Sequence, residues 1–194
     1  MMESEQLIDL LNQLTQQIQS NIHTATVAIV TSVNSRTINC KPAINRVVDG
    51  QSIELPEFIE VPPIFLAGGS SHIAMPIKAG DECLLIFSER CFDRWYHGQN
   101  FIEPLELRMH DYSDGFALVG IKSLAKAISI PDVIEINGDT VLTGDLSIQG
   151  NVVIEGDLTV SGKITCAQLE VNGSDYSNHT HRESDGGTTS SPIS

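Results

Sequence analysis

The sequence has few basic residues, no long apolar run and no leader-like start. Among its 194 residues, 11 are Lys or Arg and 25 are Asp or Glu, which gives a formal net charge of −14. This charge argues against nucleic-acid binding, because phosphate contacts require basic faces. No apolar run is long enough to span a bilayer, and the acidic, polar start MMESEQ is unlike a signal peptide. We therefore expect a soluble, non-secreted protein.

Cysteine is scarce, and its spacing fits neither a metal site nor a disulfide framework. None of the four cysteines belongs to a CxxC motif: Cys40, Cys83, Cys91 and Cys166. Scattered single cysteines are typical of buried free thiols, and Cys166 falls on a core position of the repeat described next.

A six-residue repeat dominates residues 132–173. Its glycines fall six positions apart, and Asp or Asn follows the first four: Gly138, Gly144, Gly150, Gly156 and Gly162. Apolar residues lie two and four places after the glycines: Leu146 and Ile148, Val152 and Ile154, Leu158 and Val160, Ile164 and Cys166. The alternation predicts short strands, and the glycines predict positive φ or tight turns where each strand ends. Such a pattern is typical of a β-helix.

The length of the repeat indicates how this β-helix is built. About seven hexads would give a single-chain β-helix roughly two coils, which cannot close a core. If three chains wind around a common axis, each strand rests on a neighbour's strand, and roughly seven strands make a prism roughly 30 Å long. The sequence therefore predicts an intertwined, triple-stranded β-helix over residues 132–175. The pattern slips at Ala167, which we interpret as a tapering or altered last turn.

Residues 1–21 are predicted to form a short helix with Ser4 as its N-cap. Its apolar residues repeat at spacings of 4, 3 and 4: Leu7, Leu11, Leu14 and Ile18. This stripe is too short to hold an oligomer by itself. It suits packing against the next domain, clustering with its copies in a trimer, or an ordinary amphipathic helix.

Residues 22–121 carry short β-type runs separated by proline and glycine. The runs are Thr24–Val33, Arg36–Val47, Phe58–Leu66, Glu82–Phe87 and Phe116–Ile121. About five strands in roughly one hundred residues predict a small barrel like the OB-fold, although spacing alone does not separate it from a sandwich. Residues 122–131 form a linker. The predicted fold class is all-β: an N-terminal helix, an OB-fold-like barrel and a trimeric β-helix with a metal-capped apex.

Several segments resemble one family. The segments MPIKAGDECLLIF, DRWYHG and RMHDYSDGFALVGIKS look like the N-terminal barrel of the central spike proteins of contractile phage tails. The hexads and the ending Asn178-His179-Thr180-His181 are similar to the triple-stranded β-helix and metal-holding tip of that family. The order of barrel, hexads and His-x-His is the specific part of the resemblance.

The resemblance implies a homotrimer at the centre of the tail baseplate of a virion, assembled in the host cytoplasm. Its barrel end would meet the hub and tail tube proteins, and its point would be driven through the outer membrane of a Gram-negative cell when the sheath contracts. No lysozyme-like domain separates barrel and β-helix, so another protein must digest the cell wall. The thirteen residues after His181 have the composition of an ordered turn or a flexible end.

His179 and His181 are the predicted metal ligands of the apex, residues 176–194. Residues two apart in an extended chain face the same side, so three chains would present six imidazoles to one axis. Six ligands suit an octahedral ion better than zinc, so we expect iron(II), one ion per trimer, in line with what the resemblance implies. Such an ion would close the narrow end and do no catalysis, because protein fills every position.

Enzymatic interpretations lack an organised motif. No nucleophile motif or acid–base spacing organises the histidines and aspartates of the barrel region: His72, His97, His110, Asp81, Asp93, Asp111 and Asp114. Hexapeptide acyltransferases need more coils and a histidine within them, and residues 132–173 contain none. A bactofilin-like polymer would have a longer, central β-helix. We predict a structural protein without catalytic residues, with the polymer and, less favoured, the acyltransferase as alternatives.

Overall fold

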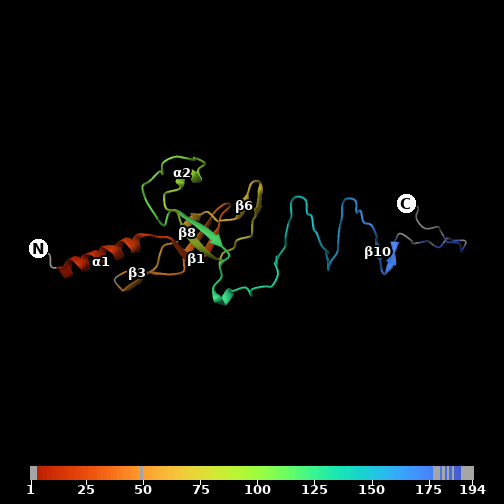
Figure 1. Cartoon of the computed structure of the whole chain (residues 1–194), viewed down its shortest axis with the longest axis horizontal. Helices are drawn as coiled ribbons and strands as arrows, with labels where there is room; N and C mark the ends of the chain where they lie inside the picture. The colour runs from red at the N-terminus through yellow and green to blue at the C-terminus, as the bar shows by residue number, and fades with distance from the viewer. Residues whose placement is uncertain are drawn as a thin grey trace. The chain divides into compact units, whose positions relative to one another are not determined.

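The computed structural model describes residues 4–48, 50–176, 180, 182, 184 and 186–188. The chain divides into two compact units, Met1–Glu135 and Ile136–Ser194, and is mostly β with one long helix (Figure 1). Among the described residues, no helix combines the length and the apolar character that crossing a membrane requires.

Helix α1 (Ser4–Asn21) confirms the predicted N-terminal helix. Its apolar side is uncovered within the single chain, since Leu7, Leu14 and Ile18 are 48%, 46% and 61% exposed. The helix is therefore amphipathic by sequence, but its apolar stripe has no cover from its own chain.

Five antiparallel strands form the main sheet: β1 (Ala25–Val33), β2 (Ile38–Pro42), β5 (Phe58–Val61), β8 (Glu82–Phe87) and β9 (Gly115–Val119). Their order is β5-β2-β1-β8-β9. The segment after β5 reaches the opposite edge, because Ile64 N donates to Ala117 O at 2.8 Å and Ala117 N to Pro62 O at 2.9 Å. The sheet is therefore curled into a half-barrel, and the five predicted β runs each supply one of its strands.

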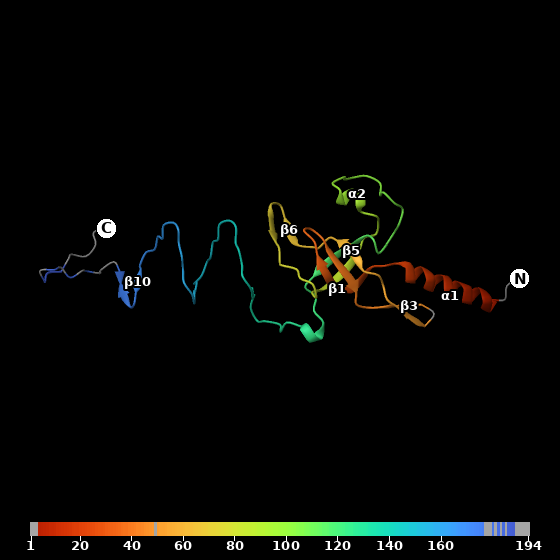
Figure 2. The same cartoon turned by 180° about the vertical axis from the view of Figure 1, so that it is seen from behind.

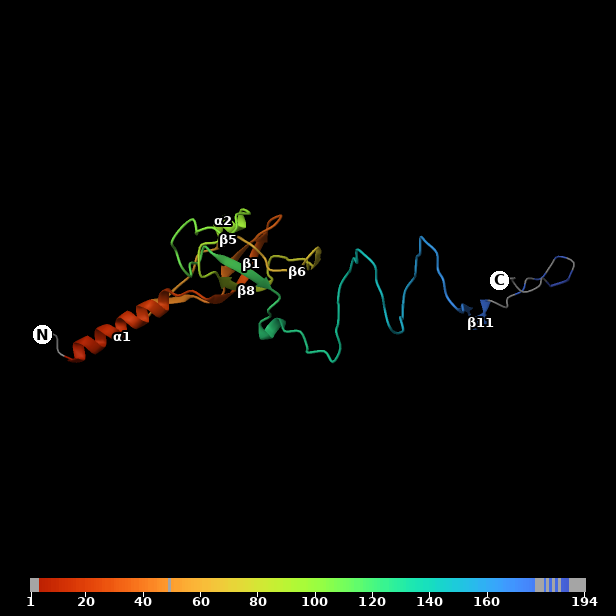
Figure 3. The ribbon, with the colours of Figure 1, turned by 45° about the horizontal axis from the view of Figure 1, so that its top comes forward.

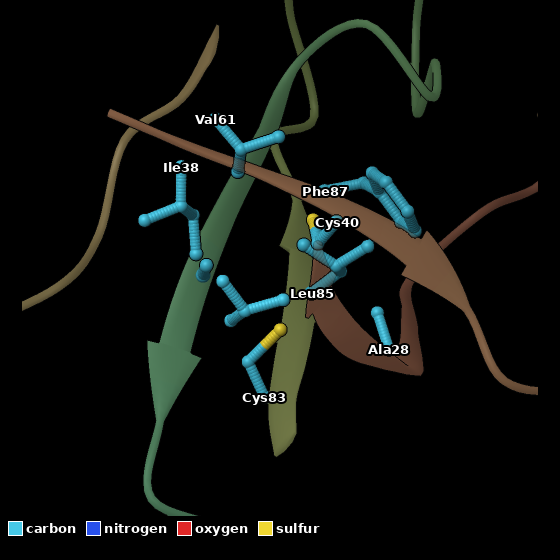
Figure 4. Close-up of a cluster of buried hydrophobic side chains, with 9 residues drawn as sticks. Ala28, Ile38, Cys40, Val61, Cys83, Leu85 and Phe87 are labelled. Carbon is cyan, nitrogen blue, oxygen red and sulfur yellow. The ribbon is translucent and has the colours of Figure 1, made fainter. Parts of the chain in front are cut away.

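The inner face of this sheet holds the core, as the alternation along β8 (ECLLIF) illustrates. Cys83, Leu85 and Phe87 are buried, whereas Ile86 between them is 38% exposed. The core cluster consists of Ala28, Val30, Ile38, Cys40, Val61, Cys83, Leu85, Phe87 and Ala117. The side chains labelled in Figure 4 gather on the inner face of the curled sheet. The prediction of buried free thiols is confirmed for Cys40, Cys83 and Cys91. Cys166 is a free thiol that is exposed in the single chain, so its burial in a core formed by three chains stays a prediction.

Two small hairpins project from the sheet (Figure 2). They are β3 (Arg46–Val48) with β4 (Gln51–Ile53), and β6 (Leu66–Gly68) with β7 (Ser71–Ile73). The predicted strand over residues 36–47 is thus split between β2, which ends at Pro42, and β3.

Two short helices complete the first unit: α2 (Asp93–Tyr96) and the 3₁₀ turn η1 (Leu124–Lys126). Turn η1 lies in the predicted linker and is tied to β8. Ser123 Oγ donates to Glu82 Oε1 at 2.8 Å, and Lys126 Nζ lies 3.3 Å from the same oxygen.

In the second unit, residues 136–169 are an undulating extended chain without a strand (Figure 3). Bends recur at residues 138, 144, 149–150, 155–156, 161–162 and 167, which is close to the six-residue period of the glycines. Gly138 and Gly144 have positive φ, 121° and 127°. A single chain offers these segments no strand partner, so the triple-stranded β-helix stays a prediction.

A hairpin ends the repeat where the sequence suggested an altered turn. Strands β10 (Glu170–Val171) and β11 (Ser174–Asp175) are joined by Asn172 and Gly173, both at positive φ, 51° and 76°. Asn-Gly is the preferred pair for a two-residue turn of this hand. This hairpin was not predicted from the sequence, although the Asn-Gly pair signals it.

Candidate functional site

The predicted metal ligands His179 and His181 both lie outside the described residues. The iron site at the apex therefore stays a prediction.

The hexad residues form a row of uncovered apolar side chains. At the positions two and four places after the glycines, exposure runs from 44% at Val160 to 68% at Leu146. Val153, which lies between two such positions, is 84% exposed. Soluble proteins seldom leave a long apolar row uncovered, so this row is a candidate surface for contact between chains.

A different group of side chains, on residues 88–114 between β8 and β9, has the composition of a metal site. We call these residues the excursion. Ligand atoms of Cys91, Asp93 and Asp114 all lie within 4.8 Å of one another. Their types and spacing could hold a cation, and this group was not predicted from the sequence.

The guanidinium of Arg108 already binds the two carboxylates of this group. Its Nε lies 2.6 Å from Asp114 Oδ2, and its Nη2 lies 3.0 Å from Asp114 Oδ1 and 2.9 Å from Asp93 Oδ2. Its Nη1 reaches Glu106 Oε2 at 2.6 Å, and the Cys91 thiol donates to Asp93 Oδ2 at 3.3 Å. A cation would have to displace this guanidinium and deprotonate the thiol, so these residues fit an ion-pair network better than a metal site.

The network joins the two ends of the excursion. Asp114 is completely buried, and its Oδ1 also accepts a hydrogen bond from Phe92 N at 3.2 Å. Hydrogen bonds from Arg108 lower the pKa of Asp93, and the Asp114 carboxylate is the main reason why the pKa of Arg108 is raised. Nothing in the sequence spacing indicated that Arg108 would pair with both carboxylates, because this depends on how the excursion folds back.

The histidines considered for acid–base chemistry lie on separate segments. His72 belongs to the exposed strand β7, His97 follows α2, and His110 comes near the end of the excursion. His110 Nδ1 is buried and has no hydrogen-bond partner among the described residues.

A further histidine, His23, is stacked on Tyr112 with ring centroids 3.6 Å apart. Burial is the main cause of its lowered pKa, and the charge of Arg46 lowers the pKa further. This pair was not predicted from the sequence, because the stacking joins the segment before β1 to the excursion.

A cleft of about 500 Å³ lies between β5 and the excursion. One wall is formed by Pro56–Pro62, and the other by residues around α2 together with Tyr112 and Gly115. β5 lies at one edge of the sheet and β9 at the other. Among the described residues, backbone pairing between these two edges occurs just after β5 ends, between Pro63 and Ala117. The cleft is thus the place where the half-barrel stays open.

Comparison with known proteins connects this first unit with phages. Residues 26–120 match the family model described as "Phage protein Gp138 N-terminal domain". The matched stretch starts in β1 and ends just after β9, so it comprises the half-barrel and the excursion. No match was found among curated proteins. The predicted resemblance is confirmed at this level: the half-barrel is similar to a domain of a phage protein family.

Proposed function

We propose that the chain is the trimeric central spike of a contractile-tail baseplate, which pierces the bacterial outer membrane when the sheath contracts. The observation that carries the proposal is the row of uncovered apolar side chains in the six-residue repeat. It follows a domain similar to phage proteins, bends about every six residues, and leaves its apolar side chains 44–68% exposed. Three copies wound around one axis would bury these side chains together and supply the missing strand partners.

The glycines of the repeat support contacts between chains. Gly150, Gly156 and Gly162 do not have φ in the left-handed range, and a Cβ at each would meet nothing within 4 Å. Nothing inside one chain therefore requires glycine at these positions. Close approach of a neighbouring backbone does require it.

The two units suit the two ends of a spike. In our proposal, residues 1–121 dock on hub and tail tube proteins, because the half-barrel carries hairpins, loops and the uncovered stripe of α1. The strand order and the parallel bridge between Pro63 and Ala117 favour an OB-fold. Residues 122–194, which include the repeat, form the penetrating end, with one iron(II) held by His179 and His181 of three chains.

The role is mechanical, and we propose no catalytic residues. Stiffness would come from continuous backbone pairing between chains and a dry core of Val, Leu and Ile. The protein would act in the virion at the tip of the tail. The rival proposal, a bactofilin-like polymer, shares the hexads but does not account for the phage-like domain before them.

The mass of the purified particle tests the proposal. We expect a trimer, three times 21.1 kDa. Ile154→Asp should abolish it, because three carboxylates would meet near one axis, where burial of charge is strongly unfavourable. Val153→Asp is the matched control and should keep the trimer, because the alternation puts Val153 on the outer side of the proposed strand. A folded wild-type monomer, filaments, or an unchanged trimer in Ile154→Asp would each refute the spike.

A further inference from the structure

The geometry points to a peptide-binding function of the first unit that is separate from trimer formation. We propose that the cleft between β5 and the excursion binds an extended segment of a partner protein that carries an arginine or lysine side chain. Trimer formation does not require this site, and the docking of residues 1–121 proposed above names no binding cleft.

The first support is the open edge of β5. A strand edge without a partner presents backbone donors and acceptors that an added strand can pair with. β5 pairs with β2 on one side, and its other side borders the cleft. An extended peptide laid along β5 would fill the gap that separates β5 from β9.

The second support is the character of the walls. Phe58, Phe92, Tyr96 and Tyr112 line the cleft, and the ring centroids of Phe58 and Tyr112 lie 5.4 Å apart. Aromatic faces attract cations as well as apolar groups. These rings can therefore receive the stem and the charged head of a long basic side chain.

The third support is the charge of the β5 wall. Glu57 and Glu60 line the cleft, and neither forms an ion pair with any described Lys or Arg. The Glu57 carboxylate accepts a hydrogen bond from the Thr31 hydroxyl, which leaves its charge unpaired. Asp93, on the facing wall, is already paired with Arg108. Two carboxylates thus remain without a cationic partner, which makes the cleft complementary to a positive side chain.

Glu60 has an uncommon backbone conformation. Its φ is 56°, in the left-handed region, which a residue other than glycine adopts only at an energetic cost. It interrupts the register of β5 against β2, and its N–H is bonded to the Asn39 side chain at 3.0 Å instead of to a strand. Glycine would remove this cost but also the carboxylate, so a glutamate at this position agrees with a binding role for its side chain.

The probes are pentapeptides with blocked termini and the sequence Thr-Val-X-Val-Thr, where X is the central residue. The central residue is arginine, its neutral isostere citrulline, or glutamate, and a fourth peptide carries arginine on an N-methylated backbone. Calorimetry with the full-length protein measures affinity. Fluorescence of Trp95, whose ring lies 6.3 Å from that of Phe92 on the cleft wall, reports the place of binding.

We expect saturable binding of the arginine peptide, at least about ten-fold tighter than the citrulline and glutamate peptides and weakened by salt. N-methylation should also abolish binding, because it removes the donors that pair with β5. Glu60→Gln should lose most of the preference for arginine, whereas Glu103→Gln, the same change elsewhere on the excursion and outside the residues that line the cleft, should keep it.

Equal binding of the arginine and citrulline peptides, no saturable binding, or an unchanged preference in Glu60→Gln would overturn the proposal. A change in the mass of the particle in Glu60→Gln would also overturn it, since the cleft would then be a contact between copies of this chain. The mass of the wild-type particle tests the spike proposal independently of peptide binding, so either proposal can fail while the other stands.

Discussion

The two units of this chain differ in where their apolar side chains find cover. In the first unit, Leu85, Cys83 and Ala117 are completely buried by strands of the same chain. In the second, the hexad residues stay 44–68% exposed although they show the same period-two alternation. The difference lies in the turns: those of the first unit bring strands back beside one another, whereas those of the repeat carry the chain onward. Alternation alone therefore does not make a core, because the connections decide which chain covers the apolar face.

The largest effect we expect is on the first unit, where stability depends on one buried ion pair. Arg108→Met should lower its free energy of unfolding by about 3–5 kcal/mol, because it leaves the Asp114 carboxylate buried without its partner. Denaturant unfolding of the full-length protein measures this. Arg90→Met is the matched control, since its pair with Glu89 is exposed, and it should cost under about 0.5 kcal/mol. If the two variants are equally stable, the network does not stabilise the first unit.

Labelling of cysteines tests the contrast between the units directly. Cys40 and Cys83 are buried within one chain, whereas Cys166 is exposed in it but occupies an inward hexad position. In the native particle we expect all three thiols to react with a maleimide slowly. In Ile154→Asp, Cys166 alone should react at least about 100-fold faster, because dissociation removes its cover. Mass spectrometry of the labelled peptides gives the rates. Fast labelling of Cys166 in the wild type would mean that no other chain covers the repeat.

The smallest effect concerns acid sensitivity of the first unit. The pKa of His23 is lowered in the folded state, chiefly by burial, so folding favours its neutral form. Its contribution to stability is complete above its unfolded pKa of about 6.5 and falls as the pH drops below that value. His23→Gln should flatten the decline in the unfolding midpoint between about pH 7.5 and 5.5. His72→Gln, a change on the exposed strand β7, should leave the decline as it is. If the unfolding midpoint declines with the same slope in the wild type and in both variants, titratable groups other than His23 cause the decline.

Much of the architecture is readable from the sequence, because local patterns produce it. The spacing of Leu7, Leu14 and Ile18 predicts α1, and alternation along ECLLIF predicts β8. The glycine period predicts the bends of the repeat, and Asn172-Gly173 would have predicted its closing hairpin. These features depend on a few neighbouring residues, so the chain specifies them before any tertiary contact forms.

Other features were decided only by the tertiary structure. The sequence does not show that Arg108 meets both Asp93 and Asp114, because the excursion must fold back before the three groups come together. It does not show that β5 stays an open edge beside a cleft, because this depends on how far the sheet curls before its two edges touch at Pro63 and Ala117. Short-range periodicity fixes helices, strands and bends, whereas ion pairs and clefts arise from residues far apart in the chain, whose approach depends on the packing of the whole unit.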